Sequence, residues 1–233
     1  MDGIINLNKP AGITSARAVA RVKRLLPKGT KIGHAGTLDP FATGILLLLV
    51  GRATKLCEAL MDQPKQYDAT VFLGATTATD DPESPAIAWP AAPSKRDAHP
   101  SLQDVSKVLS EYKGQITQIP PVFSALRING RRAYDLARRG TPPVMVARPV
   151  MVYDIQLIDY SFPELRLRVG CGRGTYIRSL ARDIGATLDV GGHLTQLQRT
   201  RIGQFGIASA KSLDNLSAQT LESDLIPLDA IRI

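Results

Sequence analysis

The sequence has few of the residues that build disulfide frameworks and metal centres. Cysteine occurs only twice, as Cys57 and Cys171, and histidine only three times in 233 residues. The two cysteines lie far apart and form no CxxC pair, and the histidines lack the spacing of a ligand motif such as HExxH. The sequence therefore predicts neither a disulfide framework nor a resident metal.

Long apolar runs and an N-terminal targeting segment are also missing. The longest apolar run, Ile45–Val50, is much shorter than the roughly 20 residues that cross a bilayer. The first ten residues contain no basic region followed by an apolar one, as a signal peptide would. We therefore expect a cytoplasmic protein that has no membrane partner.

The charge balance favours a polyanionic partner. The chain has 29 Lys and Arg against 21 Asp and Glu, which gives a net charge of +8. Its hydrophobic content of 44% is ordinary for a globular protein, and its length suffices for a full-sized core. A basic excess of this size is typical of proteins that bind nucleic acid, although charge alone does not identify the partner.

One stretch, GHAGTLDPFATG at residues 33–44, has the composition of a tightly shaped loop. Its glycines permit backbone conformations that other residues avoid, and Pro40 fixes φ. The loop has a single carboxylate, Asp39, between Leu38 and Pro40. An Asp before a proline often only starts a turn, so the local pattern leaves open whether Asp39 caps a turn or takes part in chemistry.

Hydrophobic periodicity predicts the other elements. Alternating or unbroken apolar residues predict strands over 3–7, 45–50, 66–73, 150–160, 164–170 and 191–203. Capping residues and helical spacing predict helices from Thr14 and Ser15 up to Pro27, from Ser101, and after Gly174. Five prolines predict an irregular connection over about 81–100, with one brief strand near Ile87–Trp89.

A basic segment follows at about residues 113–141. It contains an expected Asn129-Gly130 turn and an expected helix from Arg131 to Gly140. Such a projecting hairpin and helix could bind the phosphates of a folded RNA, while an exposed helical hairpin explains the pattern about equally well. The candidate RNA contacts are Arg127, Arg131, Arg132, Arg138 and Arg139.

Arg178 lies in the first turn of the helix expected after Gly174. A cation at that position opposes the helix dipole. This unfavourable placement weakly favours a paired or functional arginine.

Four motifs in order resemble those of the TruB-type pseudouridine synthases, the tRNA pseudouridine-55 synthases. The segment at 33–46 matches the family's GHxGTLDPxAxGxL, and KQY with LGATTATD at 65–80 matches its second motif. GTYIRS at 174–179 and GGHLTQLQRTRIG at 191–203 resemble the third and fourth. The string NKPAGITS at 8–15 also resembles the family's N-terminal motif, so Lys9 and Pro10 are expected to support the loop.

The resemblance implies a fold and a reaction. The fold is α+β, a pseudouridine synthase fold with a mixed, mostly antiparallel sheet flanked by helices. Residues 1–233 would form one catalytic domain with a basic insertion that grips the tRNA T arm, and without the C-terminal PUA-type module of many members. The reaction would convert uridine 55 of the T-loop to pseudouridine without metal or cofactor. We expect a monomer whose partner is tRNA.

The resemblance also implies roles for single residues. Asp39 would be the nucleophile and Arg178 its ion-pair partner. Tyr67 would lie against the target base and is a candidate for handling the C5 proton, although composition alone makes it an ordinary strand aromatic. The remaining residues expected to bind the flipped uridine are His34, Tyr176 and Leu197.

Other functions remain as alternatives. A tRNA-binding or folding protein with secondary catalysis would need only the basic surface, and would leave Asp39, Tyr67 and Arg178 without a task. A phosphotransferase with an aspartyl nucleophile needs a second carboxylate for magnesium, as in DxD, which the sequence DPFA at 39–42 lacks. The atom that Asp39 attacks also stays open, since a carboxylate can attack either C1′ or the base.

Overall fold

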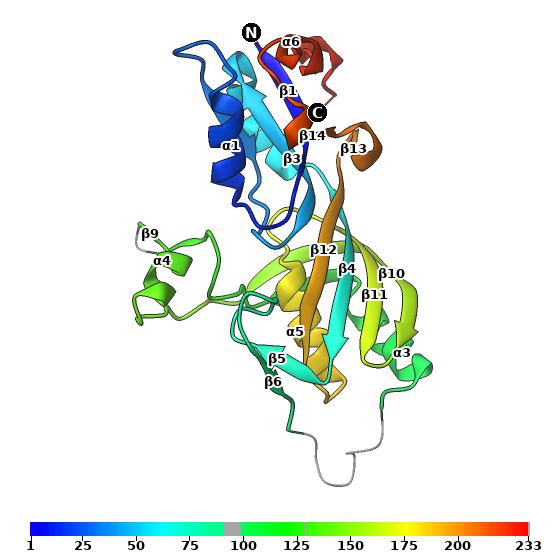
Figure 1. The fold of residues 1–233 in the computed structure, drawn as a ribbon. Coiled ribbons are helices and arrows are strands. Elements are labelled where there is room, and N and C mark those ends of the chain that lie inside the picture. The colour runs from blue at the N-terminus through cyan, green and yellow to red at the C-terminus, as the bar shows by residue number, and fades with distance from the viewer. Residues whose placement is uncertain (91–98, 129, 233) are drawn as a thin grey trace. The chain divides into compact units, whose positions relative to one another are not determined.

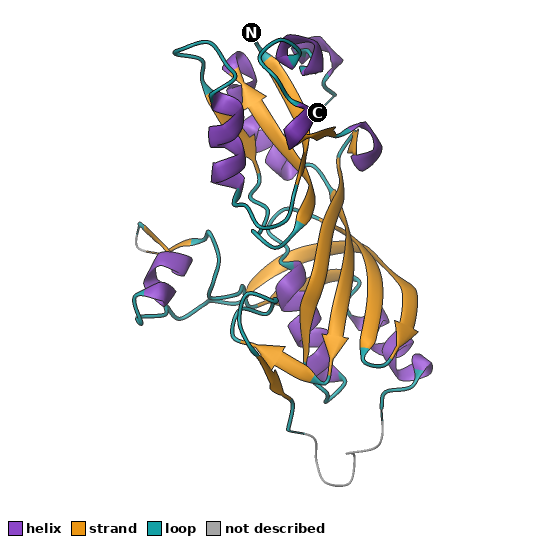
Figure 2. Ribbon diagram, in the orientation of Figure 1, coloured by secondary structure: helices purple, strands orange, loops and turns teal. Residues whose placement is uncertain are grey.

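The computed structural model describes residues 1–90, 99–128 and 130–232 (Figure 1). Strands and helices both occur along the chain (Figure 2), so the fold is α+β, as expected. Most strand pairs are antiparallel and a few are parallel, which confirms the expected mixed sheet.

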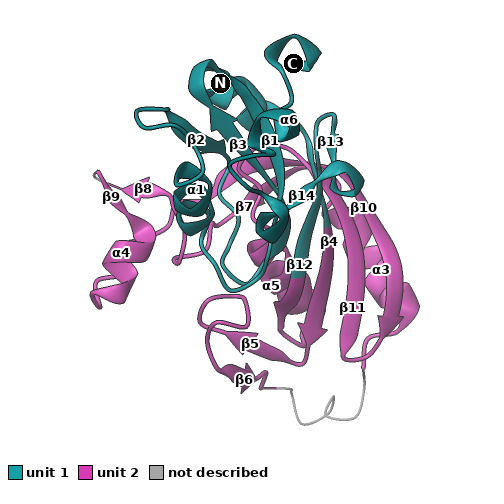
Figure 3. Ribbon diagram, turned by 45° about the horizontal axis from the view of Figure 1, so that its top comes forward, with its two compact units in different colours: residues 1–67, 197–233 teal, residues 68–196 magenta. Residues whose placement is uncertain are grey.

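The chain forms two units (Figure 3). Unit 1 comprises residues 1–67 and 197–233, and unit 2 comprises residues 68–196. Two strands, β4 (Lys65–Leu73) and β12 (Gly192–Ile202), contribute residues to both units.

The strands of unit 1 follow the order β14-β1-β3-β12, with β2 paired to β3 and β13 to β12. Strand β3 pairs antiparallel with β1 and β2 and parallel with β12. The strands within this unit are β1 (Gly3–Lys9), β2 (Ile32–Ala35), β3 (Thr43–Val50), β13 (Phe205–Gly206) and β14 (Lys211–Ser212).

Short helices complete unit 1. The first, α1, begins as predicted, because the Thr14 side chain accepts a hydrogen bond from the backbone N–H of Arg17. It ends at Lys23, before Pro27. The helical segments are α1 (Ser15–Lys23), η1 (Gly51–Leu56), α2 (Cys57–Asp62), η3 (Ile207–Ser209), η4 (Leu213–Asn215), α6 (Leu221–Asp224) and η5 (Leu228–Ala230).

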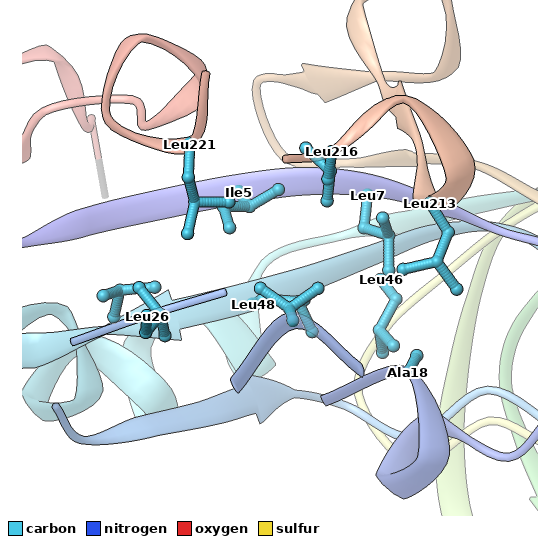
Figure 4. Close-up of a cluster of buried hydrophobic side chains, with 11 residues drawn as sticks. Ile5, Leu7, Ala18, Leu26, Leu46, Leu48, Leu213, Leu216 and Leu221 are labelled. Carbon is cyan, nitrogen blue, oxygen red and sulfur yellow. The ribbon is translucent and has the colours of Figure 1, made fainter. Parts of the chain in front are cut away.

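Strand β3 is buried on both faces, which explains its unbroken apolar sequence. One face, with Leu46 and Leu48, packs in a cluster with Ile5, Leu7 and Ala18 (Figure 4). The opposite face packs in a second cluster that includes Leu60 and Phe205. The core of unit 1 therefore lies on both sides of the strand that follows the Asp39 loop.

The strands of unit 2 follow the order β12-β4-β11-β10-β7. Strands β10 and β11 pair antiparallel around the predicted turn, with Ser161 opposite Glu164. A separate pair, β5 with β6, confirms a brief strand near the predicted position, and residues 91–98 of the expected irregular connection lie outside the described residues. The strands are β5 (Ala75–Thr77), β6 (Ala86–Ala88), β7 (Gly114–Gln118), β10 (Arg148–Ser161) and β11 (Glu164–Cys171).

Two longer helices belong to unit 2, α3 (Leu102–Glu111) and α5 (Ile177–Thr187). Helix α3 begins after Ser101 as predicted, and Ser101 and Asp104 exchange hydrogen bonds in a capping box. Helical spacing predicts an apolar face with residues 177, 180, 181, 184 and 188, of which the first four are buried, while Leu188 follows the helix and is half-buried. Among the described residues, no helix is long and apolar enough to cross a membrane.

The first strand of the basic insertion, β7, belongs to the sheet, and only the part with the hairpin and the helix stands apart from the rest of unit 2 in both views (Figures 1 and 3). Strands β8 (Arg127–Ile128) and β9 (Arg131–Arg132) form a hairpin, and α4 (Ala133–Arg138) follows. The helix begins later than predicted because the two arginines of β9 pair with β8. Gly140 follows α4 with φ +75°, as a helix-ending glycine should. In the expected Asn129-Gly130 turn, Asn129 lies outside the described residues.

Replacement of Leu48 by Ala should lower the free energy of unfolding by about 2–5 kcal/mol, because the buried side chain leaves a cavity in the core. Denaturant unfolding of the full chain measures this change. Leu102→Ala, at an exposed position of α3, serves as the control and should have little effect. Equal effects of the two substitutions would contradict the packing described for β3.

Candidate active site

The Asp39 loop connects β2 to β3 in unit 1, and two of its three glycines have backbone conformations that other residues avoid, whereas Gly33 lies in β2 without a positive φ. Gly36 and Gly44 have φ +88° and +102°, which side chains of L residues rarely adopt. A Cβ at Gly44 would lie 2.3 Å from the carbonyl oxygen of Arg199. Glycine is therefore required at position 44 both by its backbone conformation and by the close approach of β12.

The residues on either side of Asp39 are fixed by hydrogen bonds. The Leu38 N–H donates to Ser15 Oγ at 2.9 Å, and that hydroxyl lies 3.0 Å from the Leu38 carbonyl oxygen. The Gly12 N–H donates to the Pro40 carbonyl oxygen at 2.9 Å. Because the neighbours on both sides are held, the backbone from which the carboxylate projects has little freedom.

Lys9 is a buried cation below the same loop. Its Nζ donates to the carbonyl oxygens of Pro10 at 2.7 Å, Ile13 at 2.9 Å and Pro40 at 3.2 Å. The pKa of Lys9 is lowered to about 8, mainly by burial and in smaller part by Arg199, while the carboxylate of Asp39 opposes this shift. The expected supporting role of Lys9 agrees with these contacts, since Pro40 adjoins Asp39.

The other sequence-predicted residues of unit 1 lie on strands. His34 is on β2 opposite Leu48, and its carbonyl oxygen accepts a bond from Cys57 Sγ at 3.6 Å. Tyr67 on β4 and Leu197 on β12 are both buried. Unit 1 thus contains Asp39 and three of the residues expected to bind the uridine.

Arg178 and Tyr176 belong to unit 2. The Arg178 guanidinium is buried and forms an ion pair with Asp81 at 3.3 Å. It also donates to the carbonyl oxygens of Thr79 at 3.1 Å and Phe123 at 3.0 Å. These acceptors hold the guanidinium in one orientation, which fits a functional arginine better than a solvated one.

Sequence reasoning missed Asp81, because the matched motif ends at Asp80. Asp80 instead pairs with Arg182 at 3.1 Å, and burial raises the pKa of Asp80 while Arg182 lowers it. The backbone at Asp80 has φ +59°, so the chain turns sharply between the two carboxylates. In the sequence, Asp81 is visible only as a second carboxylate directly after the LGATTATD motif. The turn at Asp80 in the structure shows which of the two carboxylates contacts Arg178.

Two further residues that the sequence did not single out hold Tyr176. Its backbone N–H donates to Gln118 Oε1 at 2.8 Å, and Gln118 Nε2 donates to the Tyr176 carbonyl oxygen at 3.0 Å. The guanidinium of Arg148 lies 5.4 Å from the centroid of the Tyr176 ring and donates to the Gly174 carbonyl oxygen at 2.7 Å. Backbone and ring are therefore both held.

The insertion gathers most of the predicted RNA-contact arginines around one pocket. Arg138 differs from the others, since its guanidinium lies 4.5 Å from the centroid of the Tyr134 ring. The pocket is lined by Arg127, Gly130, Arg131, Arg132, Asp135, Leu136 and Arg139. Four guanidinium groups around a single hollow, with one carboxylate, suit a phosphate.

Comparisons with known proteins agree with these observations. The family described as TruB family pseudouridylate synthase (N terminal domain) matches residues 23–177. The family described as tRNA pseudouridylate synthase B C-terminal domain matches residues 178–231.

Individual relatives are similar over almost the whole chain. The tRNA pseudouridine synthase B of Aromatoleum aromaticum is 44% identical over 99% of this chain and 74% of its own length. That of Clostridium kluyveri is 40% identical over 98% of this chain and 77% of its own length.

Solved structures show the same fold. A Cbf5-Nop10-Gar1 complex contains a chain with a TM-score of 0.70 and 30% identity over 99% of this chain and 57% of that one. A chain of the archaeal box H/ACA sRNP Nop10-Cbf5 complex has a TM-score of 0.66 and 29% identity. The match covers 95% of this chain and 55% of that one. The chain therefore spans a little over half the length of these structural relatives.

Substitution of Asp81 by Asn should cost about 3–5 kcal/mol of unfolding free energy, because it removes the charge of a buried carboxylate that pairs with the Arg178 guanidinium. Denaturant unfolding measures the loss. Asp214→Asn, which breaks the exposed pair with Arg21, is the matched control and should cost no more than about 1 kcal/mol. Similar losses for both variants would show that the Asp81 pair is not a buried one.

Removal of the Lys9 ammonium should change how stability depends on pH. The pKa of Lys9 is about 8 in the folded chain against 10.5 as its ordinary value, so the unfolded chain binds more protons between these values. The free energy of unfolding of the wild type should therefore rise, relative to Lys9→Met, as pH increases from about 8 to 10.5. Unfolding curves at pH 7.5 and at 10 test this, with the exposed Lys55→Met as control. A pH-independent difference would contradict it.

Proposed function

Because the chain belongs to the TruB family of pseudouridylate synthases, a family of RNA-modifying isomerases, we propose that it converts uridine 55 in the T-loop of tRNA to pseudouridine, with Asp39 as the nucleophile. The reaction class and the tRNA substrate are supported by curated relatives, named tRNA pseudouridine synthase B, at 40% and 44% identity. The T-loop position and the nucleophile are the finer parts of the proposal.

The observation that carries the proposal is the fixed loop around Asp39. Isomerisation breaks the N1–C1′ bond, turns the base and joins C5 to C1′, so that N1 gains a proton and C5 loses one. A carboxylate can form the temporary bond, either to C1′ or to the base. Such a step requires a carboxylate that is held in one orientation. The hydrogen bonds to the backbone of Leu38 and Pro40 provide a rigid support for it.

The second part of the proposal concerns Arg178. It pairs with the Asp39 carboxylate and keeps it ionised in a partly desolvated pocket. The buried position of Arg178 and its bonds to Asp81, Thr79 and Phe123 support this role, because they orient the guanidinium before substrate binds.

The target base must leave its stack to reach Asp39, since a stacked uridine hides C1′ and C5. In the proposal Tyr67, Tyr176 and Leu197 bind the flipped uridine. His34 occupies the space that the base leaves in the RNA, or it holds the Asp39 loop. Tyr67 also handles the C5 proton. The contacts of Gln118 and Arg148 with Tyr176 support the view that this aromatic is held for a ligand.

The insertion binds the T arm through its phosphates in this proposal. The pocket lined by Arg127, Arg131, Arg132 and Arg139 supplies the guanidinium groups, with Arg138 beside it. We further propose that residues 1–233 act as one catalytic domain, as a monomer in the cytoplasm. No cofactor enters the reaction, because bonds break and form within one nucleoside without net oxidation.

Isomerisation of a T-arm stem-loop with uridine at the target position, in the presence of a chelator, tests the function. The wild type and Asp229→Asn, which changes an exposed carboxylate, should form pseudouridine, whereas Asp39→Asn should form none. A normal yield of pseudouridine from Asp39→Asn would exclude Asp39 as the nucleophile. No product from any of the proteins, on the stem-loop or on full-length tRNA, would favour a tRNA-binding protein instead.

Neutralising two arginines of the insertion should weaken RNA binding in a salt-dependent manner. The double variant Arg131→Gln/Arg132→Gln should lower the slope of log K against log salt concentration by about 0.7–0.9 for each lost phosphate contact. The controls are the wild type and Arg166→Gln, which changes an exposed arginine on β11 outside the pocket. Filter binding over a salt series measures the slopes, and an unchanged slope in the double variant would exclude the pocket as a phosphate site.

A further inference from the structure

Arg199 on β12 is a second buried cation at the Asp39 loop, with only 2% of its surface exposed. Its side chain donates to three backbone carbonyl oxygens. Nε lies 2.7 Å from the oxygen of Ile45, Nη1 3.3 Å from that of Thr37 and Nη2 3.1 Å from that of Gly36. All three acceptors belong to the segment that contains Asp39.

The three acceptors lie on both sides of Asp39 in the sequence. Gly36 and Thr37 precede it, and Ile45 follows it where β3 has begun. One planar guanidinium therefore joins the two ends of the loop through three nitrogens whose relative positions are fixed, whereas a lysine would offer only one nitrogen at this position. The backbone of Arg199 is also held, because it lies opposite Gly44 in the parallel pairing of β12 with β3.

The charge of Arg199 is unusual for a purely structural device. Within residues 1–90, 99–128 and 130–232 it forms no ion pair, and its hydrogen bonds go to carbonyl oxygens. Burying a cation without a carboxylate partner is costly, and neutral donors could close a loop at lower cost. Lys9 contacts the same loop through Pro40, so two buried cations surround the segment that carries one carboxylate.

We propose that Arg199 is a positioning residue for Asp39, whose guanidinium fixes the loop from Gly36 to Ile45 in the one geometry that lets the carboxylate reach the nucleoside. The proposal rests on the proposed function. Misplacing a reacting group by about 1 Å can cost on the order of a hundredfold in rate. Because Arg199 is buried, its loss should slow the chemical step while tRNA binding is retained.

Arg201 provides a matched control on the same strand. It lies two positions further along β12 with its side chain exposed. The pairs Arg199→Lys with Arg201→Lys, and Arg199→Met with Arg201→Met, make the same chemical change at a buried and at an exposed site. Single-turnover rates with saturating T-arm stem-loop, dissociation constants from filter binding and melting temperatures are measured for all four variants and the wild type.

We expect Arg199→Lys to lower the single-turnover rate by about ten- to a hundredfold and Arg199→Met by more, as misplacement of the loop predicts. Their dissociation constants should stay within about twofold of the wild type, and both Arg201 variants should react at the wild-type rate. Rates are compared at temperatures well below each melting point, so that loss of stability does not contribute.

Chemical rescue separates positioning from folding. Adding guanidinium ion at low millimolar concentration to Arg199→Ala should restore part of the rate in a saturable manner, because the ion can donate to the same carbonyl oxygens. Arg201→Ala should not respond. A structural role alone would not give saturable recovery of rate in a protein that is already folded.

Three results would overturn the proposal. Wild-type single-turnover rates in Arg199→Lys and Arg199→Met, losses that appear only in the dissociation constant, or Arg199 variants that stay unfolded at low temperature would each assign Arg199 another role. An inactive wild type would instead contradict the proposed function. The two failures can be told apart, because a failure of the Arg199 proposal alone leaves the wild type active and Asp39→Asn inactive.

Discussion

The close approach of β12 to the Asp39 loop is the constraint on which unit 1 depends. Gly44 has no side chain because the backbone of Arg199 occupies that space, and the guanidinium of Arg199 then reaches the carbonyl oxygens of Gly36 and Ile45. Lys9 holds Pro40 from another strand. Strand β3 can support this arrangement because both of its faces are buried in apolar clusters, so the base of the loop is rigid.

Unit 2 uses the same physical means for a different group. Arg178 is also a buried arginine whose orientation is set by backbone carbonyl oxygens, but it has a carboxylate partner in Asp81. Tyr176 is fixed through its own backbone by Gln118. In both units the groups assigned to chemistry are held by buried polar contacts, which is costly for stability but defines geometry.

The sequence predicted what local patterns determine. The buried strand at 45–50, the helix cap at Ser101 and most of the buried positions of α5 follow from periodicity and caps. The roles of Asp39 and Arg178 come from resemblance and stay predictions. Asp81 and Arg199 were not predicted in their roles, because each acts on residues far away in the sequence. Backbone carbonyl oxygens, the acceptors for Arg199, exist at every residue and leave no signal in the sequence.

In the proposed mechanism a fixed loop presents Asp39 to a flipped-out uridine. A crystal structure of the Asp39→Asn variant bound to a T-arm stem-loop tests it most directly, since the reaction would stop with the substrate in place. We expect the target uridine to be out of its stack, with its C1′ or a base carbon about 3–3.5 Å from the side chain at position 39. A uridine that remains stacked in the RNA, or one bound away from that side chain, would contradict it.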